Sequence, residues 1–246
     1  MRARTLTLIC GALLLVGCGE DDPCVDFEVL VDVRDGQQYR IVALGERCWM
    51  AENLRHLPQV DDTVSASEPR YYVWGYRGSE VSEAKAFVAS DASVYRAYGV
   101  LYNWPAAVVP GGPPRGVCPE GWHLPTDAEW ETLRQVVEPG GSADKNAAGA
   151  LLKSPRQQPE AHPRWNGPLK GASDGFGFAA LPGGWRNGTG EFAFPYEGLG
   201  AFGYWWSSTP ALGNDAWSRA ITNAEDALVR ASTSMGVGLS VRCIKD

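Results

Sequence analysis

The chain has 246 residues and a formal net charge of −7, with 44% hydrophobic and 21% charged residues. This length suits one large domain or two small ones, and the negative charge argues against nucleic acid as a partner and against electrostatic attachment to anionic lipid. Ten Trp and 29 Gly indicate loop-rich structure anchored by aromatic side chains rather than a helical bundle.

The N-terminal segment has the features of a secretion signal of the lipoprotein kind. Arg2 and Arg4 precede an apolar run over residues 6–16, and the small residue Gly17 comes directly before Cys18. At about 1.5 Å per residue, the run reaches roughly half of a bilayer core, so it is too short to span a membrane. The segment resembles the lipobox after which a bacterial signal peptidase cuts, although an ordinary signal peptide with an incidental cysteine is the alternative.

These features divide the chain into three parts. We expect a signal peptide over residues 1–17, a short acidic tether over 18–25 that begins at an acylated Cys18, and a folded domain over 26–246. The lipid is then the expected contact with the membrane. Gly19 after the acylated cysteine, rather than Asp, favours the outer membrane, with the periplasmic or the surface face left open.

The cysteine count predicts disulfide bonds. Six cysteines reduce to four once Cys10 leaves with the signal peptide and Cys18 is acylated. Four cysteines outside the cytoplasm suggest two disulfides, and three pairings are available to them. The four are Cys24, Cys48, Cys118 and Cys243.

An N-terminal β-hairpin is the first predicted element of the domain. Residues 28–33 and 38–44 have strand character and flank the dipeptide Asp35-Gly36, a strong hairpin signal. A loop centred on Gly36 places the valines of the first strand opposite apolar residues of the second. The hairpin therefore has one apolar face.

The same register bears on the disulfides, because it places Cys24 opposite Cys48 at a separation that a disulfide tolerates. A loop centred on Asp35 keeps the apolar face but offsets the two cysteines by two residues. If the first pairing holds, Cys118 and Cys243 pair by elimination.

Helices are predicted in the middle of the chain. Residues 80–89 suit a short helix, and Thr126 with Glu129 has the form of a capping box that begins a longer one. Three apolar residues follow at helical spacing: Trp130, Leu133 and Val137. Pro and Gly at 139–141 end this helix, and residues 144–153 form a second one.

The C-terminal third changes to short strands separated by Gly, Asn and Pro. The predicted strands cover residues 178–181, 203–209, 216–221, 227–231 and 239–244. A hairpin, two central helices and a late run of strands predict an α+β fold with a late antiparallel sheet rather than alternating βαβ units.

Known catalytic motifs are poorly supported. Residues 198–203 match dinucleotide-binding spacing, but no βαβ unit surrounds them, and the three histidines lie far apart, so neither a cofactor nor a metal site is predicted. Cys118 and His123 could form a nucleophile and base only if the cysteine were a free thiol, and a disulfide is the stronger expectation.

The segment from 165 to 206 is the best source of ligand contacts, because it is rich in aromatic residues and glycine. Flat aromatic faces stack on sugars at many binding sites, although most tryptophans in such a domain are packing residues. The candidate ligand-binding residues are Trp165, Asp174, Trp185, Asn187 and Trp205.

Several segments, in order, resemble the Fibrobacter succinogenes major paralogous domain. They are DGQQY (35–39), LG (44–45), CWMAENL (48–54), YGVLYNW (98–104), CPEGWHLPT (118–126), FGF (176–178), LPGG (181–184), WWSST (205–209) and SVRC (240–243). The similarity runs from about residue 26 to the end of the chain. The resemblance implies a secreted or lipid-anchored bacterial protein whose family has no characterised biochemical role.

This family pattern is also distantly similar to the C-type-lectin-like fold, including its formylglycine-generating branch. The similarity implies that the segment before the first long helix is tied to the last strand, which agrees with a Cys118–Cys243 bond. Two departures count against the known chemistries of that fold. The calcium-binding triplets of the lectins are absent, and only Cys243 stands where the formylglycine-generating enzymes have a copper-binding cysteine pair.

We therefore expect a non-enzymatic lipoprotein that serves as a binding or display module. Its expected partner is a glycan or another envelope protein. Two alternatives belong to other classes. An oxidase related to the formylglycine branch requires a free Cys118 or Cys243, and a purely structural envelope protein requires no ligand.

Overall fold

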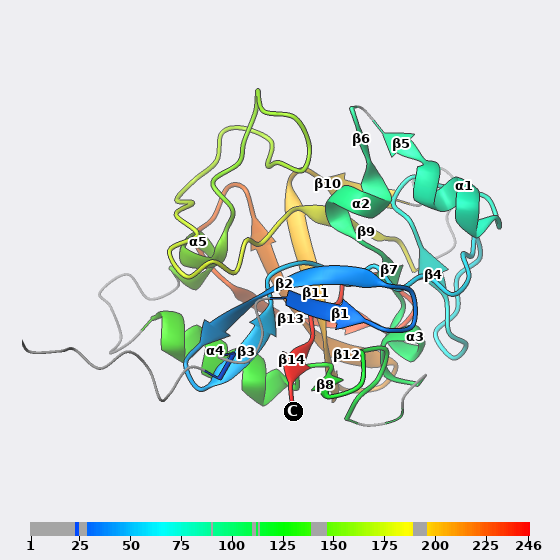
Figure 1. The fold of residues 1–246 in the computed structure, drawn as a ribbon, viewed down its shortest axis with the longest axis horizontal. Coiled ribbons are helices and arrows are strands. Elements are labelled where there is room, and N and C mark those ends of the chain that lie inside the picture. Colours follow the sequence, from blue (N-terminus) through cyan, green and yellow to red (C-terminus); the bar gives the residue numbers. More distant parts are fainter. Residues whose placement is uncertain are drawn as a thin grey trace, which may run out of the picture.

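The computed structural model describes residues 23–24, 29–89, 91–109, 112, 114–138, 147–188 and 196–246. Within these ranges the chain forms two five-stranded sheets with short helices around them (Figure 1). The predicted α+β class is confirmed at this coarse level. The predicted signal peptide, Cys18 and most of the tether lie outside the described residues.

The first sheet joins both ends of the domain, in the order β1-β2-β3-β14-β8, with antiparallel neighbours throughout. Its strands are β1 (Val29–Asp32), β2 (Gln37–Leu44), β3 (Arg47–Met50), β14 (Ile244–Lys245) and β8 (Trp122–His123). The last strand of the chain thus lies between β3 and β8. Closure of the domain therefore depends on contacts between residues far apart in sequence.

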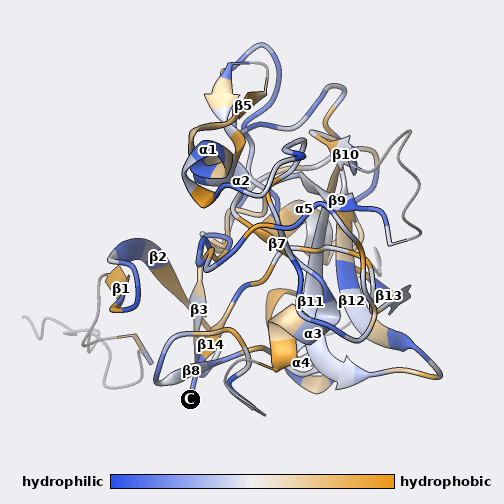
Figure 2. Cartoon of the chain, turned by 90° about the vertical axis from the view of Figure 1, so that its right-hand side faces the viewer, coloured by the Kyte–Doolittle hydropathy of each residue, from blue (hydrophilic) through white to orange (hydrophobic). Residues whose placement is uncertain are grey.

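The second sheet has the order β10-β9-β11-β12-β13. Its strands are β9 (Gly183–Arg186), β10 (Tyr196–Leu199), β11 (Phe202–Pro210), β12 (Asp215–Thr222) and β13 (Val229–Ser234). The predicted late antiparallel run is confirmed for β11, β12 and β13, whereas β9 pairs with β11 in parallel. Figure 2 shows the two sheets on different sides of the molecule.

Short helices and two small ribbons complete the described structure. The helices are α1 (Val81–Ala86), α2 (Val94–Tyr98), α3 (Trp104–Val108), α4 (Asp127–Val137) and α5 (Ala148–Leu152). The ribbons pair β4 (Tyr71–Tyr72) with β7 (Leu101–Tyr102), and β5 (Val88–Ala89) with β6 (Ala92–Ser93). Across the described ranges, none of the helices has the length and apolar character that a membrane crossing requires.

The longest helix, α4, begins as the sequence predicts. The Thr126 side chain accepts a hydrogen bond from the Glu129 amide, and the Glu129 side chain accepts one from the Thr126 amide, which completes the capping box. The apolar stripe of α4 is buried, and Trp130 packs on Trp49 of β3 with ring centroids 5.0 Å apart. The predicted second helix is short, since α5 covers only residues 148–152 of the expected range that the structure describes.

The hairpin register differs from the prediction. The structure pairs Leu30 with Tyr39, both of which are buried, whereas Val31 and Val33 are 48% and 85% exposed. The Asp32 carboxylate is buried and binds Arg34 through two of the guanidinium nitrogens, at 2.6 and 2.8 Å. This bond holds a four-residue loop over residues 33–36. The two strands are therefore shifted from the predicted register by an odd number of residues, which moves the valines to the outer face of the hairpin.

Both expected disulfides are present. Cys24 is joined to Cys48, and Cys118 is joined to Cys243 across 125 positions of sequence. The Cys24–Cys48 bond is present although the predicted hairpin register is wrong, so the bond does not depend on that register. Cys48 faces Ala43 across the β2–β3 pair, and β3 was not predicted as a separate strand.

Two other predicted strands are wrong or shorter than expected. Residues 178–181 form no strand and make only a bridge from Ala180 to Lys153, because the carbonyls of Phe178 and Ala179 accept hydrogen bonds from Arg242 instead. Of residues 239–244, only the end belongs to β14, while Leu239 and Ser240 make isolated bridges.

The buried His123 on β8 links the end of the chain to α4. Its Nδ1 lies 2.6 Å from an Asp246 carboxylate oxygen, and its Nε2 lies 3.0 Å from Glu129. Both ring nitrogens donate only when the imidazole is protonated. The bond to Glu129, opposed by burial and assisted by Asp246, raises the pKa of His123 above its usual 6.5. Burial opposes ionisation of Glu129, but its bonds with His123 and Thr126 outweigh that effect and lower its pKa to about 2.

We expect His123→Gln to remove a pH-dependent part of the stability. Because the folded pKa of His123 is raised, its contribution is complete below the unfolded value near 6.5 and is lost as pH rises through the folded value. Urea unfolding should show the variant about 1–2 kcal/mol less stable than the wild type at pH 5.5, with the difference much smaller at pH 9. Equal differences at the two pH values would contradict this role.

Candidate functional site

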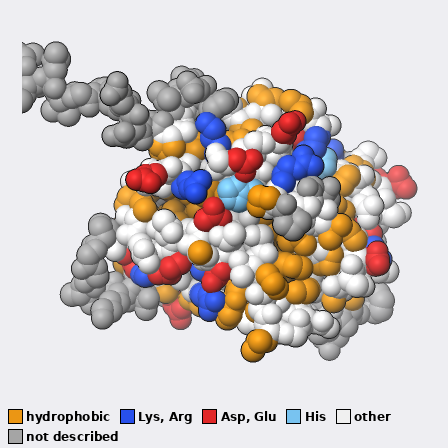
Figure 3. Space-filling model, turned by 90° about the horizontal axis from the view of Figure 1, so that it is seen from below, with side chains coloured by type: hydrophobic (Ala, Val, Ile, Leu, Met, Phe, Trp, Pro, Cys, Tyr) orange, Lys and Arg blue, Asp and Glu red, His pale blue; other side chains and the backbone are white. Residues whose placement is uncertain are grey.

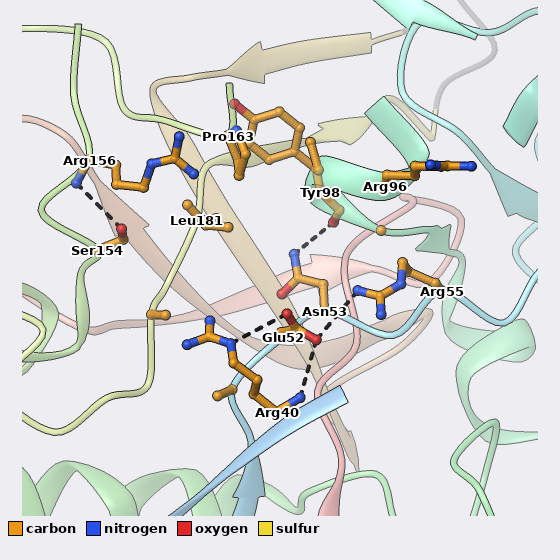
Figure 4. A pocket seen from close by; sticks show the side chains of 14 residues that line it. Arg40, Glu52, Asn53, Arg55, Arg96, Tyr98, Ser154, Arg156, Pro163 and Leu181 are labelled. Atoms are coloured by element: carbon orange, nitrogen blue, oxygen red, sulfur yellow. Dashed lines mark hydrogen bonds and ion pairs between the residues drawn. The ribbon is translucent and has the colours of Figure 1, made fainter. Parts of the chain in front are cut away.

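A cavity of about 220 Å³ opens between β2, α2 and the long loop that follows α5 (Figure 4). Four of its lining side chains are arginines and one is a carboxylate. The lining residues are Arg40, Ala51, Glu52, Asn53, Arg55, Arg96, Ala97, Tyr98, Gly99, Ser154, Arg156, Pro163, Ala179 and Leu181. We call this cavity the arginine pocket.

The four arginines come from four separate segments. Arg40 belongs to β2, Arg55 to the loop after β3, Arg96 to α2 and Arg156 to the loop after α5. Figure 4 shows Arg40 and Arg55 joined to Glu52 on one side, with Arg156 approaching from the opposite wall. Four cations and one carboxylate give the lining an excess positive charge within an acidic chain.

Arg55 is the most firmly held of the four, with a side chain only 15% exposed. It donates from Nε to the Gln37 side chain at 3.1 Å and from Nη2 to the Gln38 carbonyl at 2.5 Å, and it stacks 4.5 Å from the Tyr39 ring centroid. A guanidinium fixed in this way loses little conformational freedom when it binds an anion.

The other arginines keep more of their donors for a ligand. Arg40 is 64% exposed and shares Glu52 with Arg55, at 3.5 and 3.6 Å. Arg156 is 44% exposed and bonds to Glu160 through Nε and to a backbone carbonyl through Nη2. In the described part of the chain, the exposed Arg96 guanidinium makes no hydrogen bond or ion pair.

Asn53 lies under the floor of the pocket, and both the oxygen and the nitrogen of its side-chain amide form two hydrogen bonds. Its Oδ1 accepts from Trp205 Nε1 at 2.9 Å and from Arg242 Nε at 3.0 Å. Its Nδ2 donates to the Tyr98 carbonyl at 2.8 Å and to Ser240 Oγ at 3.2 Å. One side chain therefore ties α2, β11 and the approach to β14 together beneath the arginines.

Arg242 adds a buried charge behind this floor. It is completely buried and bonds to Asn53 and to the carbonyls of Phe178 and Ala179, all of them neutral groups. Burial lowers the pKa of Arg242 to about 9, so the side chain stays protonated at neutral pH. Its charge reinforces the positive potential of the arginine pocket.

The rim of the pocket carries a polar pair that is neutral at pH 7. Tyr98 Oη lies 2.5 Å from His162 Nδ1. Burial raises the pKa of Tyr98 to about 12, and burial together with the charge of Arg164 lowers the pKa of His162. Of the residues that line the pocket as described, none is His, Cys, Asp or Lys. The lining suits recognition of an anion.

Two of the residues predicted to contact ligand do not lie at a surface. Trp165 and Trp205 are fully buried in the aromatic core, where Trp205 contacts Trp130 and Phe178. Their indole faces pack against other side chains, so stacking of a sugar on them is not available. The prediction is corrected on this point.

The other three candidates lie elsewhere or act indirectly. Trp185 is half-buried and packs edge-on to Phe202 and Tyr204. Asn187 follows directly after β9, and neither residue is part of the lining of the arginine pocket. Asp174 has a positive φ of 45° and accepts a hydrogen bond from the Ala179 amide at 2.7 Å. It thereby holds one lining residue in place, and burial raises its pKa.

One group of potential metal ligands occurs among the described residues. Single ligand atoms of Asp32, Asp35 and His56 lie within 4.8 Å of one another. The Asp32 carboxylate is already bound to Arg34, and His56 Nδ1 lies 3.3 Å from Asp35. These bonds account for the group without an ion.

A second face of the molecule is apolar. A cavity of about 480 Å³ is lined by Trp104, Val108, Leu124 and neighbouring residues. Figure 3, which views the molecule from below, shows hydrophobic side chains gathered on the side where α3 lies. This cavity has no charged lining residue, so it offers less chemical selectivity than the arginine pocket.

Sequence reasoning missed all four pocket arginines, because no motif or spacing connects them. One available signal was composition, since arginines far outnumber lysines in the chain. Arginine is preferred over lysine where a planar carboxylate is bound through two hydrogen bonds. That preference indicates recognition but does not say which arginines converge.

Comparison with known proteins supports one assignment. No curated protein and no solved structure matches the chain. A family model described as Fibrobacter succinogenes major domain matches residues 42–245, which is most of the chain and includes every residue of the arginine pocket except Arg40. The chain therefore belongs to the Fibrobacter succinogenes major domain family.

Proposed function

We propose that this protein is a non-catalytic binding module of the bacterial cell envelope that holds a carboxylate-bearing sugar in the arginine pocket. The presence of four arginines from four segments in the lining of one cavity supports this proposal most strongly. Charge-assisted hydrogen bonds from arginine to carboxylate are among the strongest polar contacts in proteins, and they are directional. The apolar lining from Pro163 and Leu181 suits the carbon face of a sugar ring.

Two parts of this proposal concern the setting of the domain. We propose that Cys18 carries a lipid in the outer membrane and that the domain has a C-type-lectin-like fold. The bond that ties Cys118, ahead of α4, to Cys243 near the end of the chain agrees with the fold proposal. Mass spectrometry of the N-terminal peptide tests the anchor, with an acylated Cys18 in its favour and an unmodified Met1 start against it.

The state of the cysteines favours binding over the oxidase alternative. Cys118 and Cys243 are both fully buried and bonded to each other, whereas that chemistry requires a free thiol. The arginines also lie on a cavity lined by neither cysteine.

We expect the purified full chain to bind galacturonate but not galactose in a calorimetric titration at low salt. The two sugars differ in the group that the arginines would recognise, so the comparison isolates the carboxylate. Arg156→Ala should weaken galacturonate binding about tenfold, which corresponds to one lost charge-assisted contact.

Arg77→Ala is the matched control, because Arg77 is 47% exposed, pairs with an aspartate and lies outside the pocket. It removes the same charge as Arg156→Ala and should change affinity less than twofold. Equal binding of both sugars, or equal effects of the two substitutions, would overturn the proposal.

A further inference from the structure

A second basic cavity adjoins the arginine pocket. It is about 500 Å³ in volume and is lined by Gln37, Arg55, Lys85, Tyr95 and Arg96. Arg55 and Arg96 line both cavities, so the two form one continuous surface. We call the second cavity the basic shelf.

Two cations of the basic shelf are available to a ligand. The Lys85 ammonium lies 5.5 Å from the Tyr95 ring centroid and, within the described ranges, makes no hydrogen bond or ion pair. Arg96 is equally unpaired in the described structure, as noted above. Within the part of the chain that the structure describes, each cation therefore has donors left for water or a ligand.

Four carboxylates near this surface are already engaged, and Asp91, beside the rim, lies 3.9 Å from His162. Glu52 bridges Arg40 and Arg55, and Glu160 binds Arg156. Asp35 bonds to His56 and to a backbone amide, and Glu83 on α1 accepts a hydrogen bond from Tyr76. Neither cavity has a lining carboxylate other than Glu52. The combined lining therefore has more cations than carboxylates.

The sizes of the two cavities and the residues that they share indicate how many anionic groups the ligand carries. The arginine pocket, at about 220 Å³, is smaller than the basic shelf, at about 500 Å³. The shelf offers further cations beside it, shared at Arg55 and Arg96. A ligand with one anionic group would leave the shelf unused, whereas a ligand that repeats the anionic group along its length would occupy both.

The walls favour a polysaccharide over an acidic peptide. Extended peptides commonly bind by adding a strand to an open sheet edge. Gln37 and Arg40 belong to β2, which pairs with β1 along residues 37–40. On the other side of this stretch, the Gln38 carbonyl accepts a hydrogen bond from Arg55 and the Arg40 carbonyl accepts one from the Ala51 amide. Arg96 and its neighbours belong to α2. Where the structure describes the lining, contact is made through side chains without an open strand edge.

We infer that the ligand is a linear acidic polysaccharide of the uronate type, which places one carboxylate in the arginine pocket and further carboxylates along the basic shelf. This inference rests on the proposed function and deepens it, since it names the polymer rather than the single acidic sugar. Binding through several charged contacts increases affinity with chain length and makes it sensitive to salt.

Calorimetry with galacturonate oligomers of one, two, four and six units tests the inference on the full chain. Affinity should rise at least tenfold from the monomer to the tetramer. Lys85→Ala should weaken binding of the hexamer by roughly three- to tenfold and leave monomer binding within twofold, whereas Arg156→Ala should weaken both. Lys170→Ala, which removes one charge from a 65% exposed lysine outside both cavities, should change neither.

The outcomes separate the two proposals. Equal affinity for all lengths, with the Arg156→Ala effect retained, would overturn the polymer inference and leave the acidic-sugar proposal standing. No binding at any length would overturn both. Tighter binding of oligoglutamate than of the galacturonate hexamer would overturn the polysaccharide assignment in favour of an acidic peptide. Thermal melting of each variant checks that the fold is intact.

Discussion

Replacing Asn53 with alanine is expected to destabilise the protein by about 3–5 kcal/mol. The substitution removes four hydrogen bonds and leaves the buried guanidinium of Arg242 and the indole of Trp205 without the oxygen that they share. Arg242 keeps its bonds to the carbonyls of Phe178 and Ala179, but its Nε loses its partner. A hydrogen bond lost from a buried charged group costs more than an ordinary one, and this is the main cause of the large expected effect. Urea unfolding at pH 7 measures it.

Asn223→Ala provides the control for this substitution. Asn223 is half-buried and its side chain makes one hydrogen bond, to the Asn166 carbonyl at 3.2 Å. We expect its replacement to cost about 1 kcal/mol. If the two variants were equally stable, Asn53 would not have the central position that its contacts indicate.

Removal of the Cys118–Cys243 bond is expected to have the next largest effect. The bond spans 125 positions, and closing so long a loop restricts the unfolded chain by up to about 5 kcal/mol on the chain-entropy model. Replacing both cysteines with alanine should therefore lower the free energy of unfolding by about 3–5 kcal/mol. Native-state contacts of β14 with β3 and β8 depend on the same closure.

The Cys24–Cys48 bond gives the internal comparison, because it spans only 24 positions. The same model assigns it roughly 3.5 kcal/mol at most. The variant without the long-range bond should therefore unfold at a lower urea concentration than the variant without the short-range bond. The reverse order would show that loop closure is not the dominant contribution.

Local signals in the sequence predicted the fold best. The capping box of Thr126 and Glu129 depends on four neighbouring residues, and it is present as expected. The strands β11, β12 and β13 follow from short-range alternation and turn residues. The hairpin register was wrong because a buried contact, from Asp32 to Arg34, decided the turn, and propensity alone does not reveal that contact.

The candidate site was much less accessible to sequence reasoning. Trp165 and Trp205 were predicted to contact a ligand because tryptophan occurs both in cores and on binding surfaces. Both are buried, and burial depends on the tertiary structure. The four arginines of the pocket lie between positions 40 and 156, and no periodicity relates them. Asn53 does lie in the CWMAENL segment that marks the family, but its position beneath the pocket required the packed structure.

A crystal structure of the full chain with a bound galacturonate dimer tests the central claim most directly. The account predicts a sugar carboxylate within hydrogen-bond distance of the guanidinium groups of Arg55 and Arg156, with the second ring directed toward Arg96. A dimer bound on another face, with these arginines still exposed to solvent, would contradict it.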